Sequence, residues 1–135
     1  MSGQPVTKII DCSEIYSSQE IVESIVDAAL EARGKDVRVL KVASLFPEAD
    51  YFVLISGRSD RQVQGISNKI LQQLDDLGLN PSSLEGLDSG QWVLIDCGDV
   101  IVHVFYEPIR EHYDLESLWS KAPNFEVIEG LEFGE

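Results

Sequence analysis

The sequence predicts an α/β (α+β) fold: a single domain in which a mixed β-sheet is flanked by helices. Helix-like and strand-like segments alternate in the order helix, strand, strand, helix, short strand, hairpin, helix. The most apolar segment, residues 51–56, has the length of a buried strand. With 135 residues of which 44% are hydrophobic, the chain has material for one core, and it contains neither a repeat nor an internal linker.

The first helix is expected to begin after Ser17. Ser17 and Glu20 have the spacing of a capping box, in which each side chain bonds to the other residue's backbone N–H. Apolar residues then follow at helical spacing, namely Ile21, Ile25, Ala28, Ala29 and Ala32. Gly34 has the position of the left-handed residue that follows many helices.

Two strands are predicted next. The segment "VRVLKV", residues 37–42, is rich in β-branched side chains. After a break at Pro47, the segment "YFVLIS", residues 51–56, is apolar at almost every position rather than at alternate positions. Such a pattern is typical of a central strand that is covered on both faces.

The second helix is the clearest in the chain. Ser59 and Gln62 have capping-box spacing, and Gly78 is expected to end the helix. Between them an apolar stripe falls at intervals of three and four residues, formed by Val63, Ile66, Ile70, Leu74 and Leu77. The connection that follows is rich in turn residues and has room for one short strand around Leu84.

A β-hairpin is predicted for residues 91–106, with Gly98 and Asp99 as a two-residue turn. Side chains alternate between the faces of a strand, so the hairpin has two different faces. The apolar face should pack under the helices and comprises Val93, Ile95, Val102 and Val104, with Cys97 and Val100 near the turn. The mixed face comprises Trp92, Leu94, Asp96, Ile101, His103 and Phe105.

Two interpretations of the mixed face are open. Aromatic area together with polar groups suits a surface that binds a partner. A second core layer that contains a hydrogen-bonded histidine would have the same composition. Periodicity does not separate the two interpretations.

After the hairpin, Glu107 and Pro108 should start a short helix with proline at its first position. Asp114 can cap a further turn that contains Leu115, Leu118 and Trp119. Residues 1–17 are expected to form an N-terminal tail and residues 121–135 an acidic C-terminal tail, which leaves residues 18–120 as the domain.

Charge and composition restrict the function. The formal net charge of −14 argues against direct, sequence-specific nucleic-acid binding, which needs Lys and Arg on phosphates. An acidic surface attracts basic proteins. The alternative is that the negative charge only keeps the protein soluble. No apolar run reaches the roughly 20 residues of a membrane span. No signal or transit peptide is recognisable, so a bacterial-type cytoplasmic location is expected.

No catalytic constellation is apparent, so we expect a protein that is not an enzyme and has no metal or cofactor. Asp96 and Asp99 lie on a strand and in a turn, which does not suit a two-carboxylate magnesium site. The segment "SGRS", residues 56–59, precedes a helix but is not followed by a Walker lysine. Cys12 and Cys97 are too few for a structural zinc site.

Four motifs in order resemble those of one family, the ribosomal silencing factors (RsfS, also called Iojap). They are "DYFVLISGRSDRQVQGI" at residues 50–66, Glu85-Gly86, "GQWVLIDCGDVIVHVF" at residues 90–105 and "REHYDLESLW" at residues 110–119. Together with the first helix they extend over roughly residues 18–120. The resemblance implies a nucleotidyltransferase-like mixed sheet.

The resemblance also implies a function. Members of the family bind protein fourteen of the large ribosomal subunit and block joining of the small subunit, which represses translation when nutrients are scarce. Trp92 matches the tryptophan implicated in that contact. The expected partner-binding residues are therefore those of the mixed face and its turn: Trp92, Leu94, Asp96, Asp99, Ile101, His103 and Phe105. The chain departs from the family pattern at Cys97 and His112.

Two alternatives accompany this hypothesis. The fold would also suit a nucleotidyltransferase-like enzyme or nucleotide-binding module, which would need a carboxylate pair on one strand near residues 56–59. The mixed face could instead be the interface of a homodimer. That second alternative is compatible with silencing, because the same surface could be self-associated when the protein is free.

Overall fold

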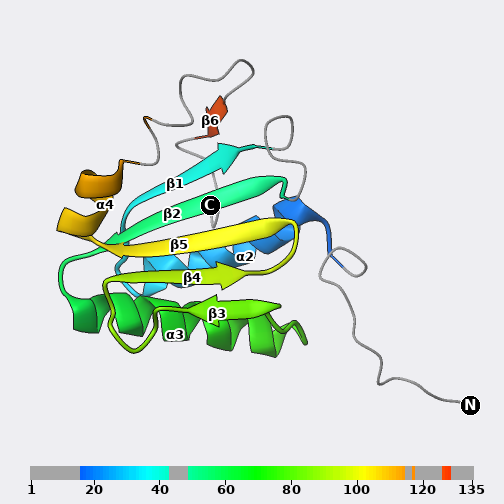
Figure 1. Cartoon of the computed structure of the whole chain (residues 1–135). Coiled ribbons are helices and arrows are strands. Elements are labelled where there is room, and N and C mark those ends of the chain that lie inside the picture. Colours follow the sequence, from blue (N-terminus) through cyan, green and yellow to red (C-terminus); the bar gives the residue numbers. More distant parts are fainter. Residues whose placement is uncertain (1–15, 43–48, 115–116, 118–125, 129–135) are drawn as a thin grey trace, which may run out of the picture.

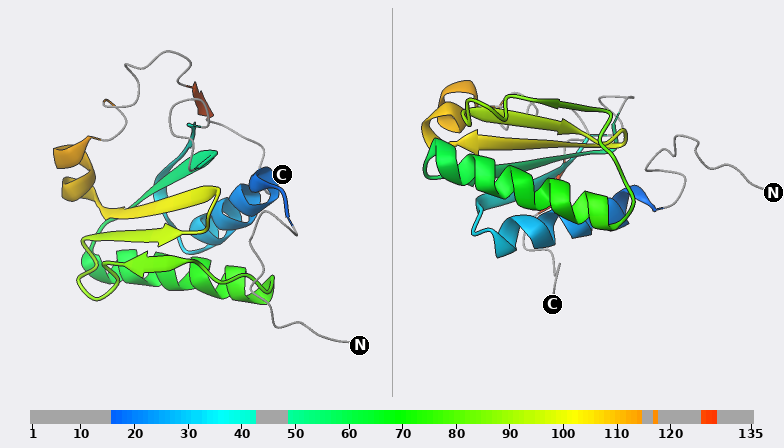
Figure 2. Two further views of the ribbon diagram at one scale, coloured as in Figure 1. Left: turned by 45° about the vertical axis from the view of Figure 1, so that its right-hand side comes forward. Right: turned by 90° about the horizontal axis from the view of Figure 1, so that it is seen from below.

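The computed structural model describes residues 16–42, 49–114, 117 and 126–128, and these form one sheet with two long helices on one of its faces (Figures 1 and 2). The sheet has six strands in the order β3-β4-β5-β2-β1-β6. The elements are α2 (Ser18–Glu31), β1 (Lys35–Lys41), β2 (Tyr51–Gly57), α3 (Asp60–Asp76), β3 (Ser83–Glu85), β4 (Trp92–Asp96), β5 (Val100–Tyr106), α4 (Glu107–Tyr113) and β6 (Glu126–Ile128).

The sheet is mixed, as the sequence predicts. β2 and β5 are parallel, whereas the other neighbouring strands pair antiparallel. β2 lies between β5 and β1, and its residues are buried from Phe52 to Gly57. The prediction of a central strand covered on both faces is therefore confirmed.

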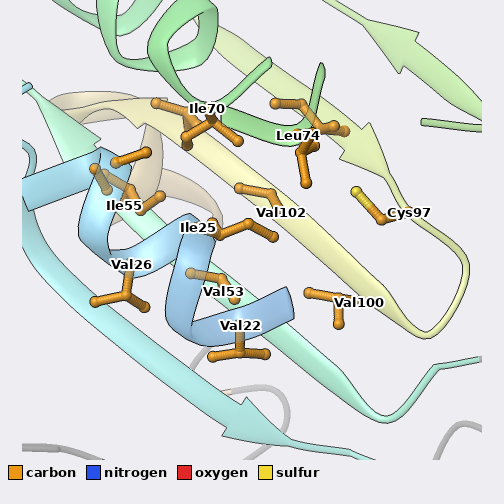
Figure 3. Close-up of a cluster of buried hydrophobic side chains, with 14 of the residues drawn as sticks. Val22, Ile25, Val26, Val53, Ile55, Ile70, Leu74, Cys97, Val100 and Val102 are labelled. Carbon is orange, nitrogen blue, oxygen red and sulfur yellow. The ribbon is translucent and has the colours of Figure 1, made fainter. Parts of the chain in front are cut away.

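Two hydrophobic clusters lie on opposite faces of the sheet. The larger one fills the space between the sheet and helices α2 and α3, as Figure 3 shows for Ile25, Ile70 and Val102. The smaller one lies on the other face and consists of Leu40, Val42, Ala49, Phe52, Leu54 and Phe105, with Trp92, Ile101 and Ile109 partly buried against it. The mixed face of the hairpin therefore contributes to a second hydrophobic cluster, which is separate from the one under the helices.

Helix α2 begins as predicted but ends differently. The Ser17 hydroxyl accepts a hydrogen bond from the Glu20 N–H (3.1 Å), and the Ser17 N–H donates to the Glu20 carboxylate (2.9 Å). The left-handed residue after the helix is Arg33, with φ of 67°, and not Gly34. Gly34 is required for another reason, because a Cβ there would lie 2.7 Å from Cγ2 of Ile55. The glycine allows the end of the helix to approach β2.

Helix α3 carries the predicted stripe. Val63, Ile66, Ile70 and Leu74 are completely buried, and Gly78 is left-handed with φ of 79°. The Ser59 hydroxyl accepts from the Gln62 N–H (3.0 Å), as expected of an N-cap. The Gln62 side chain, however, accepts from the N–H of Arg58 (2.6 Å) rather than from that of Ser59, so the second half of the capping box is displaced by one residue.

The region after the hairpin differs in two details. Pro108 is the second residue of α4 and not the first, because Tyr106 is the N-cap. Asp114 does cap a further turn, since its carboxylate accepts from the Ser117 N–H (3.4 Å). Leu115, Leu118 and Trp119 lie outside the described residues.

The segment expected to be a C-terminal tail, residues 121–135, contains a strand. β6, Glu126–Ile128, pairs antiparallel with β1 and adds an edge to the sheet. Of the expected N-terminal tail, residues 1–17, only Tyr16 and Ser17 are described. Within the described part of the chain, no helix combines the length and the apolar character needed to cross a membrane.

Candidate partner-binding surface

The hairpin has the predicted register. Trp92 pairs with Phe105, Leu94 with His103 and Asp96 with Ile101. The Cys97 N–H donates to the Val100 carbonyl (2.9 Å), which closes the turn over two residues. The apolar face is fully buried under the helices at Val93, Ile95, Val102 and Val104.

Burial divides the mixed face into an inner and an outer part. Phe105 is 1% exposed and His103 is 6% exposed, and both lie on β5. Trp92, Leu94, Asp96 and Ile101 are half-buried and reach the surface, as does Asp99 in the adjoining turn. Each interpretation of this face therefore describes a part of it. The inner residues form a second core layer, and the outer ones are accessible to a partner.

The Trp92 ring is held on several sides. Its centroid lies 5.0 Å from that of Phe105, 6.0 Å from that of His103 and 4.9 Å from that of Tyr113. Its Nε1–H donates to Nδ1 of His103 over 3.1 Å. Stacking and a hydrogen bond together fix the orientation of a large side chain that is still partly exposed.

The contact with Trp92 determines the protonation state of His103. An indole N–H can only donate, so Nδ1 of His103 must be unprotonated to accept from it. The proton of the neutral imidazole is then on Nε2, a buried atom for which none of the described residues offers a hydrogen-bond acceptor. Burial lowers the pKa of His103 to about 4. The ring is therefore neutral at pH 7, and its buried Nε2–H has no partner among the residues that the structure describes.

Asp96 and Asp99 both stabilise the turn and its surroundings. The Asp96 carboxylate accepts from the Gly98 N–H (2.9 Å). The Asp99 carbonyl accepts from the backbone N–H groups of Asp50 (2.7 Å) and Tyr51 (3.1 Å), which joins the turn to the start of β2. Among the residues that the structure describes, no group of three or more His, Cys, Asp or Glu side chains is placed to hold a metal ion.

The loop before β4 positions Trp92 through a close backbone contact. Gly86 has φ of 83°, and a Cβ at this position would overlap the carbonyl oxygen of Trp92. Only glycine combines this left-handed conformation with so close an approach. The glycine of the Glu85-Gly86 motif is therefore needed so that the loop can pass close to the backbone of Trp92.

One surface residue was missed by the sequence analysis. Tyr113, at the end of α4, is 53% exposed and its ring contacts that of Trp92. Periodicity could not have found it, because it belongs to a different element from the hairpin. Its presence in the motif at residues 110–119 was the available signal, but only the path of the chain through α4 brings it beside Trp92.

The segment "SGRS" has structural partners for both of its serines. Ser56 accepts a hydrogen bond from Nη1 of Arg110 (2.9 Å), which also donates to the Asp36 carbonyl (2.7 Å), and Ser59 caps α3. A cavity of about 520 Å³ at this end of the sheet is lined by Asp36, Arg38, Ser56, Glu107, Arg110, Glu111 and Asp114. β1 and β2 each lack the pair of carboxylates that a nucleotidyltransferase would need here.

Comparison with known proteins gives a consistent result. The family model described as "Ribosomal silencing factor during starvation" matches residues 16–133. A Bacillus subtilis protein named Ribosomal silencing factor RsfS is 38% identical over 118 residues, which cover 87% of this chain and 97% of the relative. A crystal structure of a Chromobacterium violaceum protein, 33% identical, superposes with a TM-score of 0.74 and covers 87% of this chain and 95% of that one.

A more distant mouse protein is named Mitochondrial assembly of ribosomal large subunit protein 1. It is 26% identical over 102 residues, which cover 73% of this chain and 45% of the mouse protein.

Proposed function

Because the chain belongs to the family of ribosomal silencing factors, we propose that it binds protein fourteen of the large ribosomal subunit and blocks joining of the small subunit. Translation would thereby be repressed under nutrient limitation. The observation that carries the proposal is the partly exposed Trp92, which is held in one orientation by three rings and one hydrogen bond. The name of the mouse relative, which refers to the large ribosomal subunit, supports the choice of partner.

The surface around Trp92 suits binding in two respects. An aromatic side chain that is already immobilised loses little conformational entropy when a partner covers it. Leu94 and Ile101 add half-buried apolar area beside it, and Asp96 and Asp99 add polar groups that can set the orientation of the partner. His103 and Phe105 are buried and would contribute indirectly, because they hold the Trp92 ring in place and do not reach the surface.

The proposed mechanism is steric. A protein of 135 residues that covers part of the joining face of the large subunit would obstruct the small subunit without any covalent step. No cofactor, metal ion or catalytic group is then required. In the free protein the same apolar and aromatic surface could pair two copies of the chain, and equilibrium sedimentation would detect such a homodimer.

Trp92→Ala is expected to weaken binding to isolated large subunits by about thirtyfold or more. A tryptophan near the middle of an interface commonly contributes roughly 2 kcal/mol or more on truncation, which corresponds to that factor. The variant should fold, because the indole is only partly buried and packs against the smaller cluster rather than in the larger core. It should no longer inhibit translation in a subunit-joining assay. Affinity would be measured by sedimentation of the protein with large subunits, after circular dichroism has confirmed the fold.

Val102→Ala is the matched control for this experiment. Val102 is fully buried on the opposite face of the same hairpin, so the substitution should lower stability yet preserve the affinity of the folded molecules. Normal binding by folded Trp92→Ala would show that this face of the hairpin is not the binding surface.

Binding is also expected to depend strongly on salt. The net charge of −14 attracts a basic protein at low ionic strength, and the Debye length shrinks to about 8 Å near physiological salt. The association rate with large subunits should therefore fall as salt increases, while the dissociation rate changes less. Stopped-flow measurements over a salt series would test this, and a flat association rate would contradict electrostatic steering.

A further inference from the structure

Basic side chains are concentrated at one corner of this acidic protein. The segments 33–38 and 56–62 contain five of the ten Lys and Arg residues but only two of the 24 Asp and Glu residues. Their local net charge is therefore +3, whereas the net charge of the whole chain is −14. Four of these residues form what we call the basic corner: Arg33, Lys35, Arg58 and Arg61.

The fold brings the two segments together. Lys35 begins β1, which pairs antiparallel with β2, and Arg58 follows the last residue of β2. The side chain of Gln62 joins the segments, because its Nε2 donates to the Arg33 carbonyl (3.2 Å) and its Oε1 accepts from the Arg58 N–H (2.6 Å). Arg61 immediately precedes Gln62 in the first turn of α3. The four basic residues thus lie around one junction between β1, β2 and α3.

The charges of the basic corner are accessible and have no counter-charge. Three of the four side chains are exposed, and that of Lys35 is half-buried. Within the described residues none of the four forms an ion pair, whereas Nζ of Lys69, farther along α3, lies 3.0 Å from the carboxylate of Glu31. Like charges that are held together repel one another, and a bound polyanion would remove that repulsion.

The basic corner lies at the same end of the sheet as Trp92. β1 and β4 start at this end, and β2 and β5 end there, next to α4 and the start of α3 (Figure 1). The loop that leads into β4 is fixed to α3, because Nε2 of Gln64 donates to the carbonyls of Leu87 (3.0 Å) and Asp88 (2.9 Å). A Cβ at Gly90 would lie only 2.5 Å from a backbone oxygen of α3. Trp92 and the basic corner are therefore held in fixed relative positions.

We propose that the basic corner contacts the phosphate backbone of ribosomal RNA on the large subunit while the surface around Trp92 contacts the ribosomal protein. The proposal rests on the proposed function, because docking on a ribosomal protein is what brings the corner to RNA. Arginine and lysine are the side chains that bind phosphate groups, and arginine can do so through two parallel hydrogen bonds. Contacts of this kind orient a protein on a nucleic acid without reading its sequence.

The negative charge of the chain is compatible with such a contact. A net charge of −14 repels free RNA as a whole, so the basic corner alone should not hold RNA in solution. Once the protein is docked, the four cations lie closer to the phosphates than the rest of the chain does. Screening restricts the interaction to about 8 Å near physiological salt, which favours these nearest charges.

The role of the charges is tested by Arg58→Gln and Arg61→Gln. Each substitution is expected to weaken binding to isolated large subunits by about threefold or more, and to make the slope of log affinity against log salt shallower by about one. Lys41→Gln is the matched control, since it removes one exposed positive charge from the opposite end of β1 and should change neither quantity. Wild-type affinity and salt slope in both arginine variants would show that the basic corner makes no contact.

The chemical nature of the partner is tested by hydroxyl-radical cleavage of the RNA in the complex. Saturating wild-type protein should protect a stretch of RNA backbone on the large subunit. The double variant Arg58→Gln/Arg61→Gln, at a concentration that restores saturation, should lose part of this protection, whereas Lys41→Gln should keep it. If the arginine substitutions weaken binding but leave the protection unchanged, the corner faces an acidic protein and the assignment to RNA is wrong.

The outcomes separate this proposal from the proposed function. If wild-type protein binds large subunits and Trp92→Ala does not, but both arginine variants bind normally, the basic corner is not a contact and the hairpin surface remains. If wild-type protein does not bind large subunits, the proposed function itself fails and this proposal fails with it.

Discussion

Ile70→Ala is expected to lower the free energy of unfolding by about 2–5 kcal/mol. Ile70 is completely buried, and Figure 3 shows it between α3 and the sheet, among side chains contributed by α2 and β5. Removal of its outer methyl groups opens a cavity that the surrounding side chains can fill only in part, because both helices and the sheet are fixed by many other contacts. Urea unfolding followed by circular dichroism would measure the change.

Asn68→Ala is a suitable control on the same helix. Asn68 is exposed, so its replacement should change the free energy of unfolding by no more than about 0.5 kcal/mol. The slope of the unfolding free energy with urea should be unchanged in both variants, which would show that the denatured state is not altered. An Ile70→Ala midpoint close to that of wild type would contradict the burial of this side chain.

Features that depend on neighbouring residues were predictable from the sequence. The Ser17 cap, the α3 stripe and Gly78 each follow from spacing within one element, and each is present in the structure. The register of the hairpin follows from a two-residue turn, because that turn fixes which residues are opposite one another.

Features that depend on distant residues were not predictable in the same way. Gly34 was assigned to the helix end from its position, but the left-handed residue is Arg33 and the glycine is explained by contact with Ile55. The strand at 126–128 has three residues and pairs with β1, so local pattern gives it almost no signal. Strand order along the sheet likewise depends on how the connections cross it.

The mixed face shows the same limit within a single hairpin. Alternation correctly assigned its six residues to one face, but it could not tell which were buried. His103 and Phe105 lie on β5, between β4 and β2, where the ring of Trp92 contacts both of them and the ring of Phe52 also contacts His103. Ile101 lies on the same strand nearer the turn and is only half-buried. Trp92 lies on β4, nearer the edge of the sheet, and remains partly exposed.

The free energy of unfolding is expected to decrease by about 3 kcal/mol through His103 as the pH falls from 6.5 to about 4. An unfolded histidine has a pKa near 6.5, whereas burial lowers the pKa of His103 in the folded protein to about 4. Between these values the unfolded chain binds a proton that the folded chain does not. The stabilisation from neutral His103 is therefore complete above pH 6.5 and is lost as the pH falls through that window.

This loss should be specific to His103. His103→Gln removes the titrating group but keeps an acceptor for the Trp92 indole N–H, so its unfolding free energy should depend less on pH than that of wild type in this range. His112→Gln, at an exposed position, should keep the wild-type dependence. The unfolding free energies of the three proteins would be measured at several pH values. The difference between two proteins at one pH removes the contribution of the carboxylates, which all three share. Equal pH dependence of the unfolding free energy in wild type and His103→Gln would show that His103 is protonated over the same pH range in the folded and the unfolded protein. A ring that is protonated on both nitrogens cannot accept the Trp92 hydrogen bond at Nδ1.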